Sequence, residues 1–263
     1  MSKVVCAVSA RMRSRRCPGK AVALLAGRPL LEHLLARLLS VKELEGVILA
    51  TSEAPENRVL VELAERMGVG VFSGDEEDVL GRYVEVARRW QADDVVRVTA
   101  DNPLTDLSLV RSLTALHRRE KADYTYVPGD ALLMGILPEV ISRKALEVSH
   151  RDGEDRHRSE LVTLYIKENR ERFRILKANL PAELYRPSYR LTVDEPADLE
   201  LMEAIFDRLY RPGQVLETAA AIRLLDEEPA LVAINRHLRH EAANLRSVEL
   251  DKLDKIDKIN RRT

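Results

Sequence analysis

Apolar residues in the first half of the chain alternate between two spacings. Short runs rich in β-branched residues have the length and composition of buried strands, and they occupy residues 4–8, 47–50, 69–72 and 95–98. Between these runs, apolar residues recur every three or four positions, as in amphipathic helices, over residues 30–39, 59–67 and 79–87. This order predicts a mainly parallel sheet covered by helices, with ligands bound at the carboxyl ends of the strands.

The second half of the chain has a looser pattern. It predicts further strands at residues 123–127, 173–176 and 189–193. It predicts helices that end near residue 119, begin near residue 142, and span residues 155–169 and 196–209. Pro212-Gly213 then precedes a stretch of helical character that continues to the end. We therefore expect an α/β domain over residues 1–211 and a helical C-terminal extension with a charged tail over residues 212–263.

The tail beyond His240 alternates charged residues with a narrow apolar stripe. The stripe recurs every three positions at Leu250, Leu253, Ile256 and Ile259. This pattern fits packing on the body of the protein, packing on a second subunit, or a solvated tail.

Composition removes several classes of partner. The 263 residues carry a formal net charge of -1, so no overall attraction to nucleic acid or to a membrane surface is expected. Cys6 and Cys17 are too few for a disulfide framework and do not form a CxxC pair. No apolar run approaches the roughly 18–20 residues of a membrane span. We expect a cytoplasmic, soluble protein that acts on small molecules.

A basic loop follows the first predicted strand. Pro18-Gly19 forces a turn there, just before a lysine. Guanidinium groups and a lysine beside open backbone N–H groups are suited to grip a triphosphate, although a solvated basic loop or an RNA-binding patch has the same composition. The chain has neither GxGxxG after this strand nor GxxxxGK[ST] anywhere, which excludes dinucleotide-binding dehydrogenases and P-loop kinases. The cations of the loop are Arg11, Arg13, Arg15, Arg16 and Lys20.

Two aspartates end predicted strands at the same edge of the sheet. Asp101 follows the strand at 95–98, and Asp194 follows the one at 189–193. Two such carboxylates can share one Mg²⁺ together with phosphate oxygens. Each aspartate also fits the N-cap of a following helix. From either segment alone, both interpretations stay open.

Four segments together resemble a known family. Their order is that of the cytidylyltransferases of spore-coat polysaccharide biosynthesis, which are similar to the CMP-Kdo and acylneuraminate cytidylyltransferases. The resemblance covers residues 4 to about 235. It implies a nucleotide-diphosphate-sugar transferase-like fold, that is, a Rossmann-like three-layer α/β/α architecture with a mixed, mainly parallel sheet. The segments are Arg11-Met-Arg-Ser-Arg-Arg-Cys-Pro-Gly-Lys20, Gly74-Asp-Glu-Glu-Asp-Val-Leu-Gly-Arg-Tyr83, Val98-Thr-Ala-Asp-Asn-Pro-Leu-Thr-Asp106 and Leu191-Thr-Val-Asp-Glu-Pro-Ala-Asp198.

The resemblance also implies roles for individual residues. Mg²⁺ would be held by Asp101 and Asp194, and the acceptor would be bound by Glu139 and Glu160. The segment from Asp78 to Tyr83 would line the nucleotide side of the pocket, with Arg82 as its polar contact. This segment fits the start of a helix equally well, with Asp78 as the N-cap. The residues with implied catalytic roles are Lys20, Arg11 and Asp101. The residues implied to bind the nucleotide are Ser9, Ala10, Arg11, Ser14, Arg16, Lys20, Arg82 and Asp101.

The chain departs from the family pattern in two places. Arg13 stands where the family has glycine, and a left-handed backbone at that position would strain a bulky residue by about 1 kcal/mol or more. Near Glu139 and Glu160, the chain lacks an aspartate and a histidine that the family often shows. His157 and Arg158 could bind a different acceptor, but we expect both on an exposed helix face.

The resemblance implies an Mg²⁺-dependent cytidylyltransferase that transfers CMP from CTP to a sugar acid or similar small acceptor and releases pyrophosphate. Two alternatives are a glycosyltransferase that uses a nucleotide-sugar and a non-catalytic nucleotide- or RNA-binding protein. No Asp-x-Asp motif supports the glycosyltransferase. The oligomeric state stays open, with a homodimer common among the related enzymes.

Overall fold

The computed structural model describes residues 3–128 and 134–238. Its main strands are β1 (Val4–Ser9), β4 (Val47–Ser52), β5 (Gly70–Gly74), β6 (Asp94–Thr99), β7 (Tyr124–Tyr126), β8 (Glu139–Ser142) and β9 (Ile175–Lys177), and a small ribbon is formed by β2 (Leu24–Leu25) and β3 (Arg28–Pro29). Its α-helices are α1 (Leu30–Leu39), α2 (Arg58–Arg66), α3 (Val79–Arg89), α4 (Leu107–Glu120), α5 (Arg143–Asp152), α6 (Leu164–Glu168), α7 (Pro196–Leu209), α8 (Thr218–Glu227) and α9 (Pro229–Asn235). Short 3₁₀ turns connect several of them.

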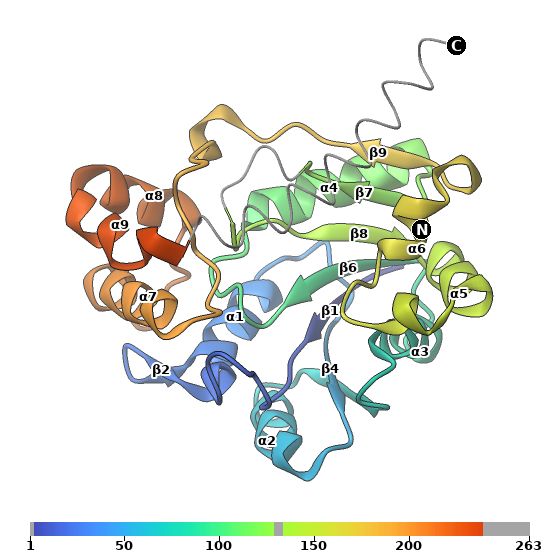
Figure 1. Ribbon diagram of the computed structural model, residues 1–263, viewed down its shortest axis with the longest axis horizontal. Helices are drawn as coiled ribbons and strands as arrows, with labels where there is room; N and C mark the ends of the chain where they lie inside the picture. Colours follow the sequence, from blue (N-terminus) through green and yellow to red (C-terminus); the bar gives the residue numbers. More distant parts are fainter. Residues whose placement is uncertain (1–2, 129–133, 239–263) are drawn as a thin grey trace.

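The main strands form one mixed sheet. Over the described residues this sheet has seven strands in the order β5-β4-β1-β6-β8-β7-β9. The first four are parallel to one another, whereas β8 runs antiparallel to both β6 and β7. Helices cover both faces of the sheet (Figure 1). The expected Rossmann-like α/β fold with a mixed, mainly parallel sheet is therefore confirmed.

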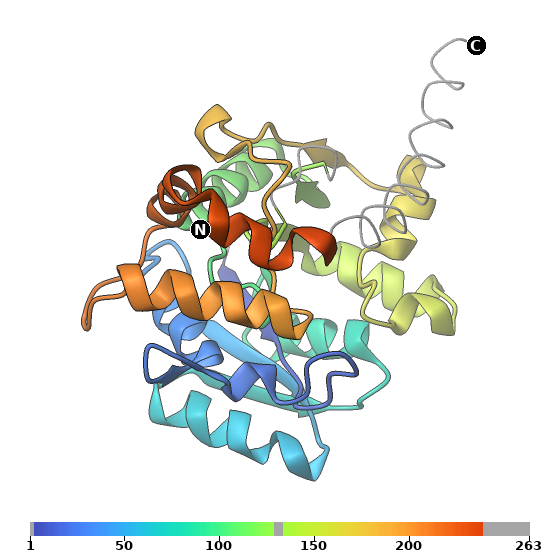
Figure 2. The same cartoon turned by 60° about the vertical axis from the view of Figure 1, so that its left-hand side comes forward.

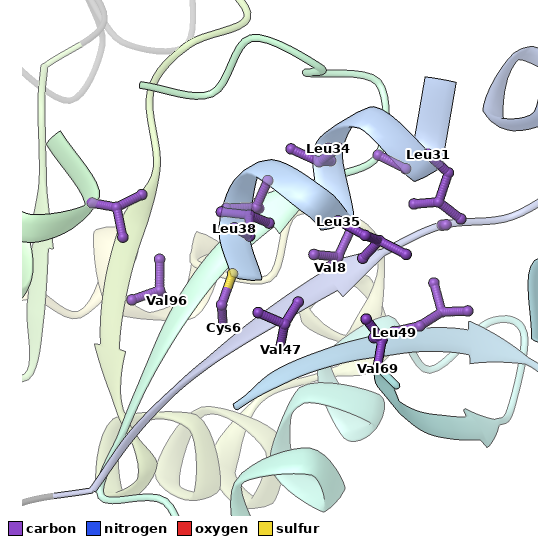
Figure 3. Packing of buried hydrophobic residues seen from close by; sticks show 14 of the residues in the cluster. Cys6, Val8, Leu31, Leu34, Leu35, Leu38, Val47, Leu49, Val69 and Val96 are labelled. Carbon is purple, nitrogen blue, oxygen red and sulfur yellow. The ribbon is translucent and has the colours of Figure 1, made fainter. Parts of the chain in front are cut away.

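Alternate residues of the parallel strands enter separate cores on the two faces of the sheet. Figure 3 shows one of these cores, in which leucines of α1 cover side chains of β1, β4 and β6. On the opposite face, Val5 and Ala7 of β1 pack against side chains of α3 and α5. This two-sided burial explains why the strands are continuous apolar runs. The labelled residues of the α1 core are Cys6, Val8, Leu31, Leu34, Leu35, Leu38, Val47, Leu49, Val69 and Val96.

A third core joins the described part of the C-terminal extension to α7. Leu201 and Phe206 of α7 are buried with Ile222 of α8 and Leu231 of α9. Figure 2 shows α7 in orange and α9 in red lying side by side. In addition, the buried Arg37 of α1 donates a hydrogen bond of 2.6 Å to Oγ1 of Thr218, at the start of α8. These contacts pack residues 212–238 directly against the α/β body.

The structure corrects two predicted elements. Residues 189–193 are not a strand, because within the described residues this extended segment forms an isolated bridge between Met134 and Arg190 and no ladder. Residues 155–169 are not one helix, because a 3₁₀ turn at Asp155–Arg158 is separated from α6 by a non-helical stretch. The predicted helix over 196–209 is confirmed as α7. The predicted helical character and apolar stripe beyond residue 238 lie outside the described residues.

Candidate active site

The carboxyl ends of β1 and β6 lie side by side and open the candidate site. Ser9 is the last residue of β1, and its carbonyl accepts a hydrogen bond of 2.9 Å from Ala100 N, just beyond β6. Ala10 continues the chain, and its carbonyl accepts a hydrogen bond of 2.9 Å from Thr51 Oγ1. The basic loop therefore leaves the sheet at the edge where parallel α/β proteins bind ligands.

Hydrogen bonds within the loop and to η2 (Pro55–Asn57) fix its path. Asn57, which is buried, accepts a hydrogen bond of 2.8 Å from the Met12 N–H. The Ser14 hydroxyl accepts one of 3.3 Å from Cys17 N. Gly19 then adopts φ 72°, a left-handed conformation that glycine tolerates best, and reverses the chain before Lys20. The turn aims the lysine back toward the strand ends.

Lys20 joins the two aspartates that the sequence singles out. Its Nζ lies 3.3 Å from Oδ2 of Asp101 and 3.1 Å from Oδ1 of Asp194, and it donates a 2.6 Å hydrogen bond to the carbonyl of Val193. Three acceptors match the three protons of an ammonium group. Asp101, 81 residues after Lys20, and Asp194, 174 residues after it, thus meet around one positive charge.

The alternative role of both aspartates as helix caps does not hold. The N-cap of α4 is Asp106, whose carboxylate accepts from Leu109 N. The N-cap of α7 is Glu195, the residue after Asp194. Asp101 and Asp194 are therefore free of capping and face Lys20.

Surrounding cations keep Asp194 ionised. Burial alone would raise the pKa of this carboxyl, but Lys20, Arg190 and Arg16 outweigh the burial and hold the pKa below its usual value. Arg16 lies 3.7 Å from Asp194 and 3.1 Å from Glu195. A negative charge is therefore maintained at this point at neutral pH.

The other arginines of the loop reach outward to acidic residues. Arg11 forms an ion pair of 2.9 Å with Glu160. Arg13 pairs with Glu56 and lies 3.8 Å from Glu76. Arg13 is not among the described non-glycine residues with positive φ, so the strain considered for this position does not arise.

The segment before α3 has both a capping aspartate and an ordering arginine. Asp78 caps α3 by accepting a 2.7 Å hydrogen bond from Gly81 N, and it also lies 2.6 Å from Nε2 of His150. Arg82 is buried and donates to the carbonyls of Asp75 and Glu76. The structure thus places Arg82 behind the segment, where it fixes the turn that precedes α3.

The two glutamates expected to bind the acceptor occupy different environments. Glu139 is mostly buried and is bound by Arg97 at 2.6 Å and by the hydroxyl of Tyr124. Burial would raise its pKa, but Arg97 and nearby Lys167 lower it to about 2. Glu160 is exposed, and its carbonyl accepts a 3.2 Å hydrogen bond from Arg97. Arg97 therefore ties the Glu160 segment to the buried carboxylate.

One residue near Glu160 lies in a different environment from the one expected. His157 was expected on an exposed helix face, but it is buried, lies 2.9 Å from Glu168 and closes the capping box of its 3₁₀ turn. Arg190 and Asp198, which lie directly behind Asp194, were not predicted as site residues from the sequence. A charged residue within an apolar extended run was the available signal, because such a residue needs a buried partner.

The two aspartates fit a magnesium site. Over the described residues no group of three or more His, Cys, Asp or Glu side chains is positioned to hold a metal. Mg²⁺ commonly takes one or two protein carboxylates and completes its coordination with substrate phosphates and water. Asp101 and Asp194 meet this requirement because both approach the same cationic atom of Lys20.

Comparison with known proteins decides the family. The model of the cytidylyltransferase family matches residues 5–233. The chain belongs to the cytidylyltransferase family. This cytidylyltransferase is 32% identical over 243 residues to an uncharacterized protein of Methanocaldococcus jannaschii, a match that covers 91% of this chain and 97% of that protein.

Two further relatives agree with this assignment. The spore coat polysaccharide biosynthesis protein SpsF of Bacillus subtilis is 30% identical over 234 residues, which cover 87% of this chain and 96% of SpsF. The structure of a cytidylyltransferase from Leptospira borgpetersenii is similar with a TM-score of 0.80 at 25% identity, covering 88% of this chain and 97% of that one. The cytidylyltransferase is therefore a nucleotidyltransferase, and the glycosyltransferase and non-catalytic alternatives are set aside.

No helix within residues 3–128 and 134–238 is both long enough and apolar enough to cross a bilayer.

Proposed function

We propose that this cytidylyltransferase transfers CMP from CTP to a sugar acid or a similar small acceptor, with release of pyrophosphate, and that the reaction depends on Mg²⁺. The observation that carries the proposal is the meeting of Lys20, Asp101 and Asp194 at the carboxyl ends of the strands. It combines a phosphate-binding cation with two carboxylates suited to a hard metal ion. The family supports the cytidylyl group as the transferred part.

The chemistry follows from where charge develops. An oxygen of the acceptor attacks the α-phosphorus of CTP, and the bond from that phosphorus to the bridging oxygen breaks as pyrophosphate leaves. Lys20 stabilises the negative charge on the leaving group, and Arg11 and Arg16 assist it from the same loop. Both arginines are exposed, and a triphosphate can recruit them from their ion pairs, which Arg11 forms with Glu160 and Arg16 with Glu195 and Asp194.

Magnesium would be held by Asp101 and Asp194. When bound, it would supply further neutralisation of phosphate charge. The protein's own contribution is to aim both carboxylates at one point and to keep Asp194 ionised. Positioning of this kind supplies much of the rate acceleration in phosphoryl and nucleotidyl transfer.

The remaining roles rest on position. Ser9, Ala10 and Ser14 would border the nucleotide, and the turn fixed by Arg82 would line its base side. On the acceptor side, exposed Glu160 is the direct contact, whereas buried Glu139 acts through Arg97. The resemblance to SpsF favours a role in polysaccharide biosynthesis in the cytoplasm.

The test is pyrophosphate release from CTP with Mg²⁺ across a panel of sugar acids and sugar phosphates. Asp101→Asn is expected to abolish turnover and to leave the melting temperature near that of the wild type. Thermal stabilisation is expected with CTP and Mg²⁺ together and not with CTP alone. Full turnover by Asp101→Asn would remove this residue from the metal site, and no pyrophosphate from any nucleotide would contradict the proposed reaction.

A further inference from the structure

A buried network lies directly behind Asp194. The side chain of Arg190 is 2% exposed and that of Asp198 is fully buried, and the two are joined by hydrogen bonds of 2.8 and 2.9 Å. Arg190 also donates a 3.1 Å hydrogen bond to Oδ2 of Asp194. The guanidinium group thus bridges one buried carboxylate and one carboxylate of the proposed metal site.

Asp198 fixes the backbone that carries Asp194. Its Oδ2 accepts hydrogen bonds of 3.0 Å from the N–H groups of both Asp194 and Glu195. This arrangement closes a tight turn between the extended segment and α7. A second close contact supports the segment. Gly135, at φ +96°, packs so closely against it that a Cβ added to this glycine would lie 2.2 Å from the Thr192 N atom. The main chain at Asp194 is therefore held from two sides.

The last component comes from the C-terminal extension. Asn235, the final residue of α9, is buried and donates hydrogen bonds of 2.8 Å to Oδ1 of Asp198 and 2.9 Å to the carbonyl of Arg190. It lies just beyond residues 5–233, which the family model matches. One amide group of the extension thus binds both members of the buried ion pair.

The network divides the two oxygens of Asp194 between separate partners. Oδ2 is bound by Arg190 from behind, whereas Oδ1 faces Lys20 at 3.1 Å and Arg16 at 3.7 Å. A buried ion pair contributes little net stability compared with apolar packing, because desolvation offsets the attraction. We therefore attribute to this ion pair the positioning of the Asp194 carboxylate rather than a gain in stability. We propose that Arg190, Asp198 and Asn235 form a positioning network that holds Asp194 Oδ1 toward the metal, so that the C-terminal extension is a working part of the site.

This inference rests on the proposed function, and metal affinity tests it without any acceptor. Binding of Mn²⁺ in the presence of CTP is measured by electron paramagnetic resonance, through loss of the free-ion signal. Arg190→Lys keeps the charge but loses the two-pronged grip on Asp198. It is expected to weaken Mn²⁺ binding about 10- to 100-fold, the range typical of residues that orient metal ligands. Asn235→Ala is expected to weaken it in the same direction by a smaller factor.

Arg37→Lys is the matched control. Arg37 is also a buried arginine, and it also binds the C-terminal extension, at Thr218 and at the Leu216 carbonyl. It does not contact Asp101 or Asp194 in the described structure, so its variant is expected to lose stability and to keep Mn²⁺ affinity within about twofold.

Three outcomes overturn the inference while leaving the proposed function in place. Wild-type Mn²⁺ affinity in folded Arg190→Lys would do so, as would an equal loss of affinity in Arg37→Lys. If Arg190→Lys does not fold, Asn235→Ala decides, and unchanged affinity in that variant would count against the network. A wild-type protein that binds no Mn²⁺ with CTP would contradict the proposed function itself, and this inference with it.

Discussion

Replacing Lys20 with methionine is the most informative change at the strand ends. The substitution keeps an unbranched side chain and removes the ammonium group that contacts two carboxylates and a carbonyl at 2.6 to 3.3 Å. Asp101 and Asp194 then lose the cation that they share, and Arg190 and Arg16 remain beside Asp194. Hydrogen bonds to charged groups contribute about 1.5–3 kcal/mol each when well shielded. These side chains retain 15–25% exposure, so we expect a total loss of about 2 kcal/mol.

This loss is measured by thermal unfolding. One kcal/mol corresponds to about 2–4 °C in proteins near this size, so the melting temperature of Lys20→Met should fall by about 4–8 °C. Mg²⁺ without nucleotide should restore part of the fall, because the two carboxylates no longer share the ammonium group that lay between them. Wild type should respond less to Mg²⁺ alone. Turnover of the variant should fall about 100-fold or more, as expected when a group that stabilises developing charge is removed.

Lys42→Met is the control for this experiment, because Lys42 is an exposed lysine in a loop. Its melting temperature should stay near that of wild type, with no added response to Mg²⁺. Unfolding of Lys20→Met at the wild-type temperature would contradict a stabilising role for the Lys20 ammonium group. So would a stabilisation of Lys20→Met by Mg²⁺ that is no greater than that of Lys42→Met.

Two further predictions concern charges around the site. Glu139→Gln should lower the free energy of unfolding at neutral pH by about 3 kcal/mol, since the folded pKa of about 2 lies below the ordinary value of 4.5. A carboxyl pKa that is lowered in the folded state stabilises the fold at pH values above the unfolded pKa. The wild type should therefore lose this contribution as pH falls from about 4.5 to about 2, and the variant should not. Urea titrations that give parallel pH profiles for the two proteins would contradict this. Arg13→Gly should change the free energy of unfolding by less than about 1 kcal/mol, because Arg13 is 70% exposed where it pairs with Glu56. A loss above about 2 kcal/mol in chemical denaturation would show that this ion pair holds the loop.

The sequence carries most of the information about the parallel half of the fold. Strands buried on both faces leave continuous β-branched runs, and helices that cover them leave a regular apolar spacing, so both kinds of element are predictable. The segment at residues 189–193 shows the limit of this reasoning. Residues 190–193 are all buried, as in the true strands, but whether an extended chain joins a sheet depends on a neighbour elsewhere in the sequence. The pattern cannot identify that neighbour.

The site, like the fold, has features that the sequence predicts and others that depend on contacts between distant parts of the chain. Lys20, Asp101 and Asp194 could each be selected from the sequence, since each follows or precedes a recognisable strand end or turn. Their meeting depends on long-range pairing, as does the difference between Glu139 and Glu160. Arg97, Tyr124 and Lys167 determine that difference, and they come from three separate elements. The support behind Asp194 was missed because Asn235 reaches it from the far end of the chain.

If the proposed reaction is right, the group transferred from CTP is CMP, which carries the α-phosphorus, and the β- and γ-phosphates leave together as pyrophosphate. The most direct measurement uses CTP labelled with ³²P at the α-position and, in a parallel reaction, at the γ-position, with Mg²⁺ and the acceptor that gives the most pyrophosphate. For CMP transfer, we expect the α-label to enter the acceptor product and the γ-label to appear only in pyrophosphate. An α-label that stays in free CMP or CDP, or a γ-label that enters the acceptor, would contradict it.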